Sequence, residues 1–487
     1  MTSNTFKPFH IAEHPFCSGH TLLPDEQGLV FGGDNVNLNA PWLTVGFQAI
    51  RVVNGSNQSD NLVGTLPSAR WYPSVVTMAD GNQLLVGGMQ QEAGGWSGDS
   101  APSDTVHPVV KCSGNAGGSI SDPGYDNPTY QIFNSTSYEL STALALTIVL
   151  ETWPVDSYPF LTLLPSGSVL IIAGAQMEAL YFAPTGASPD EAVGNLPDLP
   201  LPVSYPQYNS LALLPLKSPN YATQVLMAGG STETCASAMT PAGSTSYLVD
   251  VTPGANHAVA MEKLAFPRIM GDLTLLPDGR VFLCNGAQVG IAGSTTAGVG
   301  NAAATNGTTV AEIYDASKPV GQRWSTIADS KVWRLYHSVA FLTPNAEVFI
   351  AGSEATSERR AQIYTPDYLS SGKPRPMITS APQAMVYATT YTIQFSNVAA
   401  VDRVVLNRLA GSTHGNHFDQ RQVVLDCNGL MPSETSCMSP PNSSIAPPGV
   451  YMLFILSEGV PSYAPSVSLQ LPTAGASSAP SQVATSG

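Results

Sequence analysis

Residues 275–286 read LLPDGRVFLCNG, and this stretch decides how the chain folds. Two apolar segments flank a Pro-Asp-Gly turn, and the second segment ends in a small residue followed by glycine. Asp-Gly supplies the positive φ angles that a tight β-turn needs, and the flanking apolar runs are typical of buried strands. The stretch therefore predicts a β-hairpin.

The same pattern recurs through the first three quarters of the chain. The other copies are LLPDEQGLVFGG (22–33), TMADGNQLLVGG (77–88), LLPSGSVLIIAG (163–174), a version with a longer turn at 213–230, and LTPNAEVFIAG (342–352). A hairpin repeated at about 50 residues is the kelch spacing of a β-propeller. One unit cannot bury both of its faces alone, so successive units stack as blades around an axis.

A β-solenoid and a row of sandwiches are the alternatives to a propeller. Solenoid repeats are shorter, and sandwiches lack the recurrent strand ending in glycine. We therefore expect an all-β protein with a seven-bladed kelch-type β-propeller over residues 1–370, of which six repeats are visible and the first blade is missing or incomplete. The Gly-rich segments 94–127 and 290–307 are expected to be long loops.

The pattern changes after residue 367. SSGKPRP at 370–376 has the composition of a linker. Short alternating strands follow, such as 391–395, 403–406 and 451–456, and they predict a C-terminal immunoglobulin-like β-sandwich over residues 377–472. The Ser/Ala-rich segment 473–487 is expected to be a disordered tail.

Composition narrows the class of protein. The chain has 487 residues with 43% hydrophobic and 11% charged residues, 43 glycines and 40 prolines, which is typical of a turn-rich β protein. A net charge of −16 with 19 Lys and Arg disfavours nucleic acid and anionic membrane surfaces as partners. No apolar run of the length of a membrane-spanning helix occurs.

Cysteines and sequons indicate the compartment. No CxxC pair occurs, which disfavours a zinc ribbon or a thioredoxin-type site, and Cys427 and Cys437 are candidates for a short disulfide loop. Acidity, few lysines and several Asn-X-Ser/Thr sequons favour a secreted, extracellular protein. No signal peptide is visible in residues 1–14, so we expect the targeting segment to be missing from this sequence.

Four short segments hold residues that can carry chemistry. Cys17 lies in FCSGH before the first hairpin, and Tyr72 lies in ARWYPS before the second. Residues at equal places in adjacent blades meet around the axis, so these two are expected to be close. Tyr336 and His337 lie in WRLYHS before the last hairpin, and His414 lies in a polar hairpin tip of the C-terminal domain. Taken singly, each of these residues could have a purely structural role, as a small buried residue, a packed aromatic ring or a surface histidine.

Together the four segments resemble those of the copper radical oxidases, which include galactose oxidase and, with closer similarity, glyoxal oxidase. The resemblance covers residues 15–426, and it includes DNPTY at 126–130 and PRIMGD at 267–272. Each motif is weak alone, whereas four motifs in order at repeat-consistent places are specific.

The resemblance implies one copper ion and a set of site residues. Tyr72, His337 and His414 would lie in the copper plane, and Tyr336 would be the axial phenolate. The Cys17 sulfur would be joined to the ring of Tyr72 as a thioether, which makes a tyrosyl radical easier to form and keep. Cys17, Tyr72 and Tyr336 would be the catalytic residues.

Some positions depart from the galactose oxidase pattern. Galactose oxidase relatives place a tryptophan over the thioether, and in this chain both Trp96 and Trp71 are candidates for that place. Arg334 is a further candidate for a residue that supports the ligands without binding the metal itself. His417 has no ligand role in this mapping.

The chemistry explains the residue types. Copper(II) favours a tetragonal N,O ligand set, which imidazoles and phenolates supply. Oxidation of an alcohol or an aldehyde hydrate removes two electrons, whereas copper accepts only one. A tyrosyl radical therefore accepts the second electron. No nucleotide-binding GxGxxG motif follows a strand and opens a helix, which fits an oxidant held in the protein itself.

The expected function is therefore a glyoxal oxidase-like activity, in which small aldehydes are oxidised as hydrates to carboxylic acids and dioxygen is reduced to hydrogen peroxide. The alternatives are a galactose or primary alcohol oxidase of the same family and a non-catalytic kelch or lectin-like binding propeller. A glycosidase would need paired carboxylates in the central mouth, whereas Asp and Glu in this sequence mostly lie in turns, such as Asp80 and Asp278. The expected partners are the substrate, dioxygen and a peroxidase that uses the peroxide, and the protein is expected to be a monomer.

Overall fold

The computed structural model describes residues 11–35, 42–90, 126–153, 155–183, 188–294, 302–353, 356–409, 411–431, 433–472 and 482–484. Strands dominate these residues, and helix α1 (Thr147–Thr152) is short. Within these ranges no helix is long and apolar enough to cross a membrane.

Each sequence repeat forms the two inner strands of a small antiparallel sheet, which confirms the predicted propeller. The blades, written outward from the axis, are β1 (Gly19–Leu22), β2 (Gly28–Phe31), β3 (Ala49–Asn54) and β4 (Ser59–Thr65); β5 (Ser74–Thr77), β6 (Gln83–Val86), β7 (Thr129–Phe133) and β8 (Leu144–Ala145); β9 (Phe160–Leu163), β10 (Val169–Ala173), β11 (Gln176–Tyr181) and β12 (Asp190–Val193); β13 (Asn209–Leu213), β15 (Gln224–Gly229), β16 (Thr245–Asp250) and β17 (Ala260–Lys263); β18 (Asp272–Leu275), β19 (Val281–Cys284), β22 (Val310–Tyr314) and β23 (Trp324–Asp329); and β24 (Ser338–Leu342), β25 (Val348–Gly352) and β26 (Gln362–Tyr364). The described residues hold six such blades and no seventh.

The first strands of the blades face one another around the axis, since β5 contacts both β1 and β9, and β18 contacts both β13 and β24. The inner strands are largely buried because they pack against their neighbours on both sides, as the continuous apolar runs of the repeats predict.

One predicted loop is wrong. Residues 290–294 and 302–307 belong to a two-stranded hairpin, β20 (Ala287–Ser294) and β21 (Ala302–Gly307), beside the fifth blade, and residues 295–301 lie outside the described residues. Its residues are mostly small, and the only alternation is that of Val289 and Ile291 with Gln288 and Gly290, so the pattern that reveals strands is weak. Main-chain pairing and a small buried cluster around Ile291 hold the hairpin. Bonds from the Ala287 N–H to the Ile269 carbonyl and from the Gly290 N–H to the Thr240 carbonyl tie it to neighbouring segments. The other predicted loop, 94–127, falls almost entirely outside the described residues.

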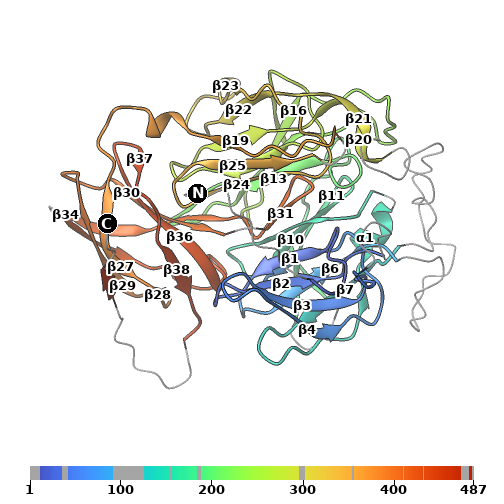
Figure 1. Ribbon diagram of the computed structural model, residues 1–487, viewed down its shortest axis with the longest axis horizontal. Coiled ribbons are helices and arrows are strands. Elements are labelled where there is room, and N and C mark those ends of the chain that lie inside the picture. The colour runs from blue at the N-terminus through green and yellow to red at the C-terminus, as the bar shows by residue number, and fades with distance from the viewer. Residues whose placement is uncertain are drawn as a thin grey trace.

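The C-terminal region is a sandwich of two sheets, as predicted (Figure 1). One sheet contains β28 (Ala384–Met385), β30 (Arg403–Arg408), β33 (Gln422–Val424), β36 (Gly449–Ser457), β37 (Val460–Pro461) and β38 (Ser466–Leu469). The other contains β27 (Met377–Pro382), β29 (Thr390–Ser396), β34 (Asp426–Met431), β35 (Glu434–Met438) and β39 (Gln482–Ala484). The domain boundaries themselves stay a prediction.

Two features of the tail and linker segments complete the fold. Strand β39 pairs with β27 inside the tail that was expected to be disordered, and the rest of that tail lies outside the described residues. Strand β14 (Leu216–Lys217) leaves the fourth blade and adds to the sandwich, where it pairs in parallel with β33. The propeller and the sandwich therefore share a sheet.

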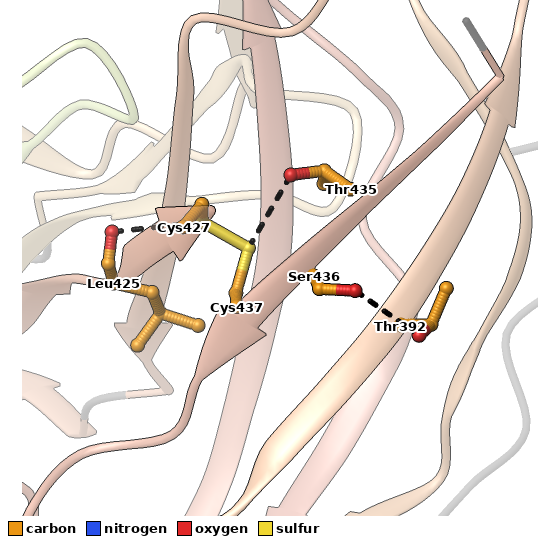
Figure 2. The surroundings of a disulfide bond; sticks show 6 residues. All are labelled: Thr392, Leu425, Cys427, Thr435, Ser436 and Cys437. Atoms are coloured by element: carbon orange, nitrogen blue, oxygen red, sulfur yellow. Dashed lines mark hydrogen bonds between the residues drawn. A yellow bond between two sulfur atoms is a disulfide. The ribbon is translucent and has the colours of Figure 1, made fainter. Parts of the chain in front are cut away.

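The predicted disulfide between Cys427 and Cys437 is present (Figure 2). The two cysteines are directly opposite each other in the antiparallel pair β34–β35. The bond closes a loop of ten residues at the edge of the second sheet.

Candidate metal centre

The predicted site residues of the propeller lie in the loops that lead into the inner strands. Cys17 is the second residue before β1, Tyr72 is the second before β5, and His337 directly precedes β24. All three have left-handed backbones, with φ angles of 58°, 60° and 63°. Such φ values are uncommon for residues other than glycine and carry strain. Cys17 and Tyr72 stand at the same place in their loops, whereas in the sixth blade the left-handed residue, His337, is one position nearer its strand and Tyr336 takes the place of Tyr72.

Buried arginines hold these loops. The Arg70 guanidinium donates to the Gly87 carbonyl at 2.6 Å, and Arg334 donates to the Gly352 carbonyl at 2.8 Å. Each bond joins the loop before a first strand to the end of the second strand. Arg334, which the sequence offered as a supporting residue, therefore holds the loop that carries Tyr336, and Arg70 holds the corresponding loop of Tyr72.

Gly352 shows how closely the loop approaches the strand. It has a φ of 79°, and a Cβ at this position would lie 2.6 Å from the His337 carbonyl oxygen. Only glycine fits there without a shift of the His337 loop. The glycine that ends the last repeat therefore sets the position of a predicted ligand.

The C-terminal domain contributes His414 through a hairpin made of β31 (Gly411–Thr413) and β32 (Asn416–Phe418). His414 and Gly415 are the two turn residues, with φ angles of 53° and 70°, which is the type I′ pattern. The hairpin contacts inner strands β1, β5, β13 and β24, and Figure 1 shows β31 reaching from the sandwich towards the middle of the propeller. The Gly415 carbonyl accepts a bond from Ser210 Oγ at 2.7 Å.

A buried carboxylate anchors this hairpin. Asp419 accepts bonds from Thr21 Oγ1 at 2.6 Å and from the Thr77 N–H at 3.0 Å, and it lies 3.4 Å from the Arg408 guanidinium. Burial alone would raise the pKa of Asp419, but Arg408 and the threonine donors hold this pKa below its ordinary value. Asp419 therefore ties the hairpin to the first two blades as a charged group.

These loops bring together all five residues that the sequence predicted. The hydroxyls of Tyr72 and Tyr336 are 2.5 Å apart. The Cys17 sulfur lies 3.6 Å from His414 Nε2 and 3.9 Å from His337 Nε2, and His414 Nε2 lies 3.3 Å from the Tyr336 hydroxyl. The ligand atoms of Cys17, His337 and His414 all lie within 4.8 Å of one another, which is close enough for one metal ion.

The donors are in suitable states for a cation. Thr413 Oγ1 lies 2.6 Å from His414 Nδ1, so the other ring nitrogen, Nε2, faces the cluster. Burial, followed by the neighbouring His337 and His20, lowers the pKa of His414 well below its ordinary value, so this imidazole is neutral and its Nε2 can ligate. Two imidazoles and two phenols are the N,O donor set that copper(II) favours. The residues present therefore fit a copper-type ion.

Two family models match the chain. The model described as glyoxal oxidase N-terminus matches residues 123–368, and the model described as galactose oxidase-like, early set domain matches residues 375–469. The chain belongs to the glyoxal oxidase family. The first match covers the greater part of the propeller, and the second covers nearly all of the sandwich.

Relatives across the whole chain agree with the family. The chain is 29% identical to a WSC domain-containing protein of Arthroderma benhamiae over 95% of this chain and 46% of that protein. It is 28% identical to the aldehyde oxidase GLOX of Vitis pseudoreticulata over 95% of this chain and 83% of that protein. It is 24% identical to a galactose oxidase of Gibberella zeae over 93% of this chain and 60% of that protein. The chain thus spans less than half of the Arthroderma protein.

A solved structure supports the fold. It is described as a novel fungal alcohol oxidase with catalytic diversity among the AA5 family, in complex with copper, and it superposes with a TM-score of 0.69 at 19% identity, over 94% of this chain and 86% of that one.

Two aromatic rings stack on Tyr72 in this member of the glyoxal oxidase family. The Trp71 ring lies 4.4 Å from the Tyr72 ring at 30°, and the Tyr205 ring lies 4.6 Å from it at 26°. Trp71 was one of the two tryptophans proposed from the sequence, and Trp96 lies outside the described residues. His417, for which the sequence predicted no ligand role, has its Nε2 atom 3.5 Å from Asp272 Oδ1, so its ring faces that carboxylate.

Sequence reasoning missed Tyr205, Tyr158 and Arg70. A signal for the tyrosines was present, because Ser-Tyr-Pro occurs at 157–159 and again at 204–206, each time just before an inner strand. Tyr158 stands two residues before its strand, as Cys17 and Tyr72 do, and Tyr205 lies in the equivalent loop but four residues before its strand. A search of every pre-strand loop for aromatic residues would have found both.

Proposed function

We propose that this protein is a copper radical oxidase that oxidises small aldehydes, as their hydrates, to carboxylic acids and reduces dioxygen to hydrogen peroxide. The observation that carries the proposal is the convergence of Cys17, Tyr72, Tyr336, His337 and His414 from three blades and the C-terminal hairpin. Membership of the glyoxal oxidase family supports it.

In this proposal Tyr72, Tyr336, His337 and His414 hold one copper ion. Copper, when bound, supplies a one-electron oxidant and a binding position for the substrate oxygen. The two imidazoles come from different domains, so the relative position of propeller and sandwich fixes the distance between them.

Tyr336 is the proton acceptor. Burial, followed by the neighbouring Tyr205, raises the pKa of Tyr336 well above its ordinary value, so without a cation this phenol keeps its proton. The charge of a bound cation lowers such a pKa and leaves a phenolate. That phenolate then takes the hydroxyl proton of the substrate at its oxygen as a general base.

Tyr72, joined to Cys17, is the second electron store. Its ring, after loss of one electron, accepts a hydrogen atom from the substrate carbon. With one proton given to Tyr336 and the remaining electron given to the copper ion that the site would hold, the substrate loses two electrons and two protons, and dioxygen takes up both to give hydrogen peroxide. The stacked rings of Trp71 and Tyr205 shield Tyr72 from solvent, which favours a long-lived radical.

A second candidate is oxidation of galactose or another primary alcohol at the same site. The similarity to a galactose oxidase over 93% of this chain favours it. The similarity to an aldehyde oxidase at 28% identity, against 24% for the galactose oxidase, and the glyoxal oxidase family match favour aldehydes.

We also propose that the protein acts outside the cell. The disulfide between Cys427 and Cys437 is of the kind that persists in oxidising compartments, and the acidic, sequon-containing sequence agrees with secretion. A peroxidase that consumes the hydrogen peroxide is the partner that the product suggests, and a monomer is sufficient because the site is built from one chain.

The test is oxygen-dependent peroxide production by copper-loaded protein with glyoxal, methylglyoxal and galactose side by side. We expect higher kcat/KM with the two aldehydes than with galactose. Faster turnover of galactose would favour the alcohol oxidase. Absence of peroxide production with all three substrates, despite one copper bound per chain, would favour a non-catalytic binding propeller.

A further inference from the structure

Tyr158 occupies the same position in the third blade as Cys17 and Tyr72 do in the first and second. It is the second residue before β9, and it has a left-handed backbone with a φ of 47°. Its side chain is fully buried. The mechanism proposed above gives it no role, although a buried tyrosine with a strained backbone needs a reason.

The hydrogen bonds of Tyr158 join the two loops that carry Cys17 and Tyr72. The Tyr158 hydroxyl donates to the carbonyl of Ser18 at 2.9 Å. The Tyr158 N–H donates to the carbonyl of Tyr72, also at 2.9 Å. One residue is therefore bonded to the main chain next to Cys17 and to the main chain of Tyr72 itself.

The ring of Tyr158 completes this contact. It meets the Tyr72 ring edge-on, with centroids 5.1 Å apart, and it lies 5.0 Å from the His414 ring and 5.7 Å from the Phe418 ring. Tyr158 thus touches Tyr72 and the hairpin that carries His414, while its hydroxyl holds the Cys17 loop. Three parts of the candidate site meet on this side chain.

The Cys17 loop needs such a support. Cys17 has a φ of 58°, which a cysteine adopts only when its surroundings impose it. The main-chain bonds of the loop include Ser18 N–H to the Pro15 carbonyl at 3.3 Å and Tyr72 N–H to the Cys17 carbonyl at 3.0 Å. The bond from the Tyr158 hydroxyl adds a side-chain contact from a third blade, and it acts directly beside Cys17.

We propose that Tyr158 is a positioning residue for the bond between Cys17 and Tyr72, an inference that rests on the proposed function. In that step the Cys17 S–H and a ring C–H of Tyr72 are broken and a C–S bond forms. Two electrons and two protons leave the protein, and dioxygen accepts them in the presence of copper and becomes hydrogen peroxide. The sulfur must lie against one ring carbon for this to occur, and the Tyr158 hydroxyl fixes the loop that carries the sulfur.

The test compares Tyr158→Phe with Tyr208→Phe. Tyr208 is equally buried, and within the described part of the chain its hydroxyl has no hydrogen-bond partner, so its removal is a matched control. Each protein is prepared without copper, copper and dioxygen are then added, and intact mass is followed with time. Copper stoichiometry and Tm are measured on the same samples.

We expect wild type and Tyr208→Phe to lose the mass of two hydrogen atoms at the same rate. Tyr158→Phe should bind one copper but lose this mass about tenfold more slowly or worse, because small displacements of reacting atoms have effects of that size. Tyr158→Met, which lacks the ring as well, should be slower still.

Equal rates for wild type, Tyr158→Phe and Tyr158→Met would overturn the inference and leave the proposed function intact. Absence of the mass loss in copper-loaded wild type would instead overturn the proposed function. A Tyr158→Phe protein that binds no copper would also count against the inference, since the hydroxyl would then act on the metal site as a whole.

Discussion

The hydroxyl of Tyr72 lies 2.5 Å from the hydroxyl of Tyr336, although 264 positions separate the two residues in the sequence. Tyr72 precedes the second blade and Tyr336 precedes the sixth, so the contact spans the propeller axis. In the proposed mechanism one of these phenols stores an electron and the other accepts a proton. The short contact makes them one hydrogen-bonded pair, and each should be sensitive to loss of the other.

Tyr336→Phe should lower kcat by about 10²–10⁴-fold, the usual contribution of a general acid or base. The phenylalanine keeps the ring but has no oxygen to accept the substrate proton, and it removes the partner of the Tyr72 hydroxyl. Steady-state peroxide assays on copper-loaded protein measure this effect. Tyr364→Phe, whose ring stacks on Phe282 in the outer part of the propeller, is the control and should keep wild-type turnover. Equal kcat for both variants would remove Tyr336 from the mechanism.

Cys17→Ser should still bind one copper per chain but lose most of its turnover, by well over the tenfold that about 1.4 kcal/mol in the barrier represents. Both imidazoles and both phenols remain, whereas the sulfur that modifies the Tyr72 ring is gone. Copper titration and oxygen consumption on the same sample separate binding from catalysis. Cys284→Ser changes the thiol at the end of β19 and serves as the control. Unchanged turnover in Cys17→Ser would contradict the assigned role.

Much of the fold could be predicted because the residues within each repeat are enough to determine its hairpin. A turn residue, two apolar runs and a closing glycine determine a hairpin, and β1 to β2 and β18 to β19 form where the pattern places them. The hairpin β20–β21 could not be predicted this way. Its strands, AQVGIAGS and AAATNG, are so rich in Ala and Gly that the short alternation of Val289 and Ile291 does not stand out, and main-chain bonds to segments distant in sequence stabilise the hairpin.

The site divides in the same manner. Cys17 and Tyr72 could be placed together because equal positions in adjacent repeats meet at the axis, and Tyr336 and His337 were expected there because their loop leads into an inner strand. The stacking of Tyr205 on Tyr72 could not be predicted, because it joins loops of two blades that are not consecutive in the chain. The distance between the two histidines also had to come from the structure, since the C-terminal hairpin and the propeller meet only in three dimensions.

Thr413→Val should weaken copper binding about 10–100-fold, the usual effect of removing the group that orients a ligating histidine. Thr413 Oγ1 lies 2.6 Å from His414 Nδ1 and fixes which ring nitrogen faces the cluster. Competition titration with a copper chelator measures the affinity. Thr392→Val, which removes a hydroxyl that bonds Ser436 in the sandwich, is the matched control and should bind copper as wild type does (Figure 2). The same affinity in both variants would show that Thr413 does not orient the ligand.

Asp419→Asn should destabilise the protein by about 3–5 kcal/mol, because it leaves Arg408 buried without a compensating charge. Arg408 and the threonine donors hold the pKa of Asp419 below its ordinary value, despite burial. The folded-state pKa is therefore the lower one, so this contribution is present at neutral pH and is lost as pH falls through the folded-state pKa. Urea unfolding at neutral and acidic pH should show a large gap between variant and wild type that narrows in acid. A gap that stays constant with pH would contradict the charged state of Asp419.

The stability of Asp156→Asn relative to wild type should be higher at and above neutral pH than in acid. Asp156 and Asp126 are both buried, and both oxygens of Asp126 and Oδ1 of Asp156 lack a hydrogen-bond partner of normal geometry within the described residues. A proton held between the two carboxyl groups would satisfy them. Burial raises the pKa of Asp156 to about 7, and burial with the adjacent Asp156 raises the pKa of Asp126 well above its ordinary value.

The sign of the effect follows from these pKa values. Between about pH 4 and pH 7 the folded protein keeps a proton on Asp156 that the unfolded chain has lost, so the contribution of Asp156 to stability falls as pH rises, by at most about 1.4 kcal/mol per pH unit. Asparagine cannot ionise and lacks this slope. The Tm of Asp156→Asn should therefore gain on that of wild type across this range and level off above it, whereas the exposed control Asp190→Asn should follow wild type throughout. A difference in Tm that does not change with pH would show that the two carboxyl groups do not hold a proton between them.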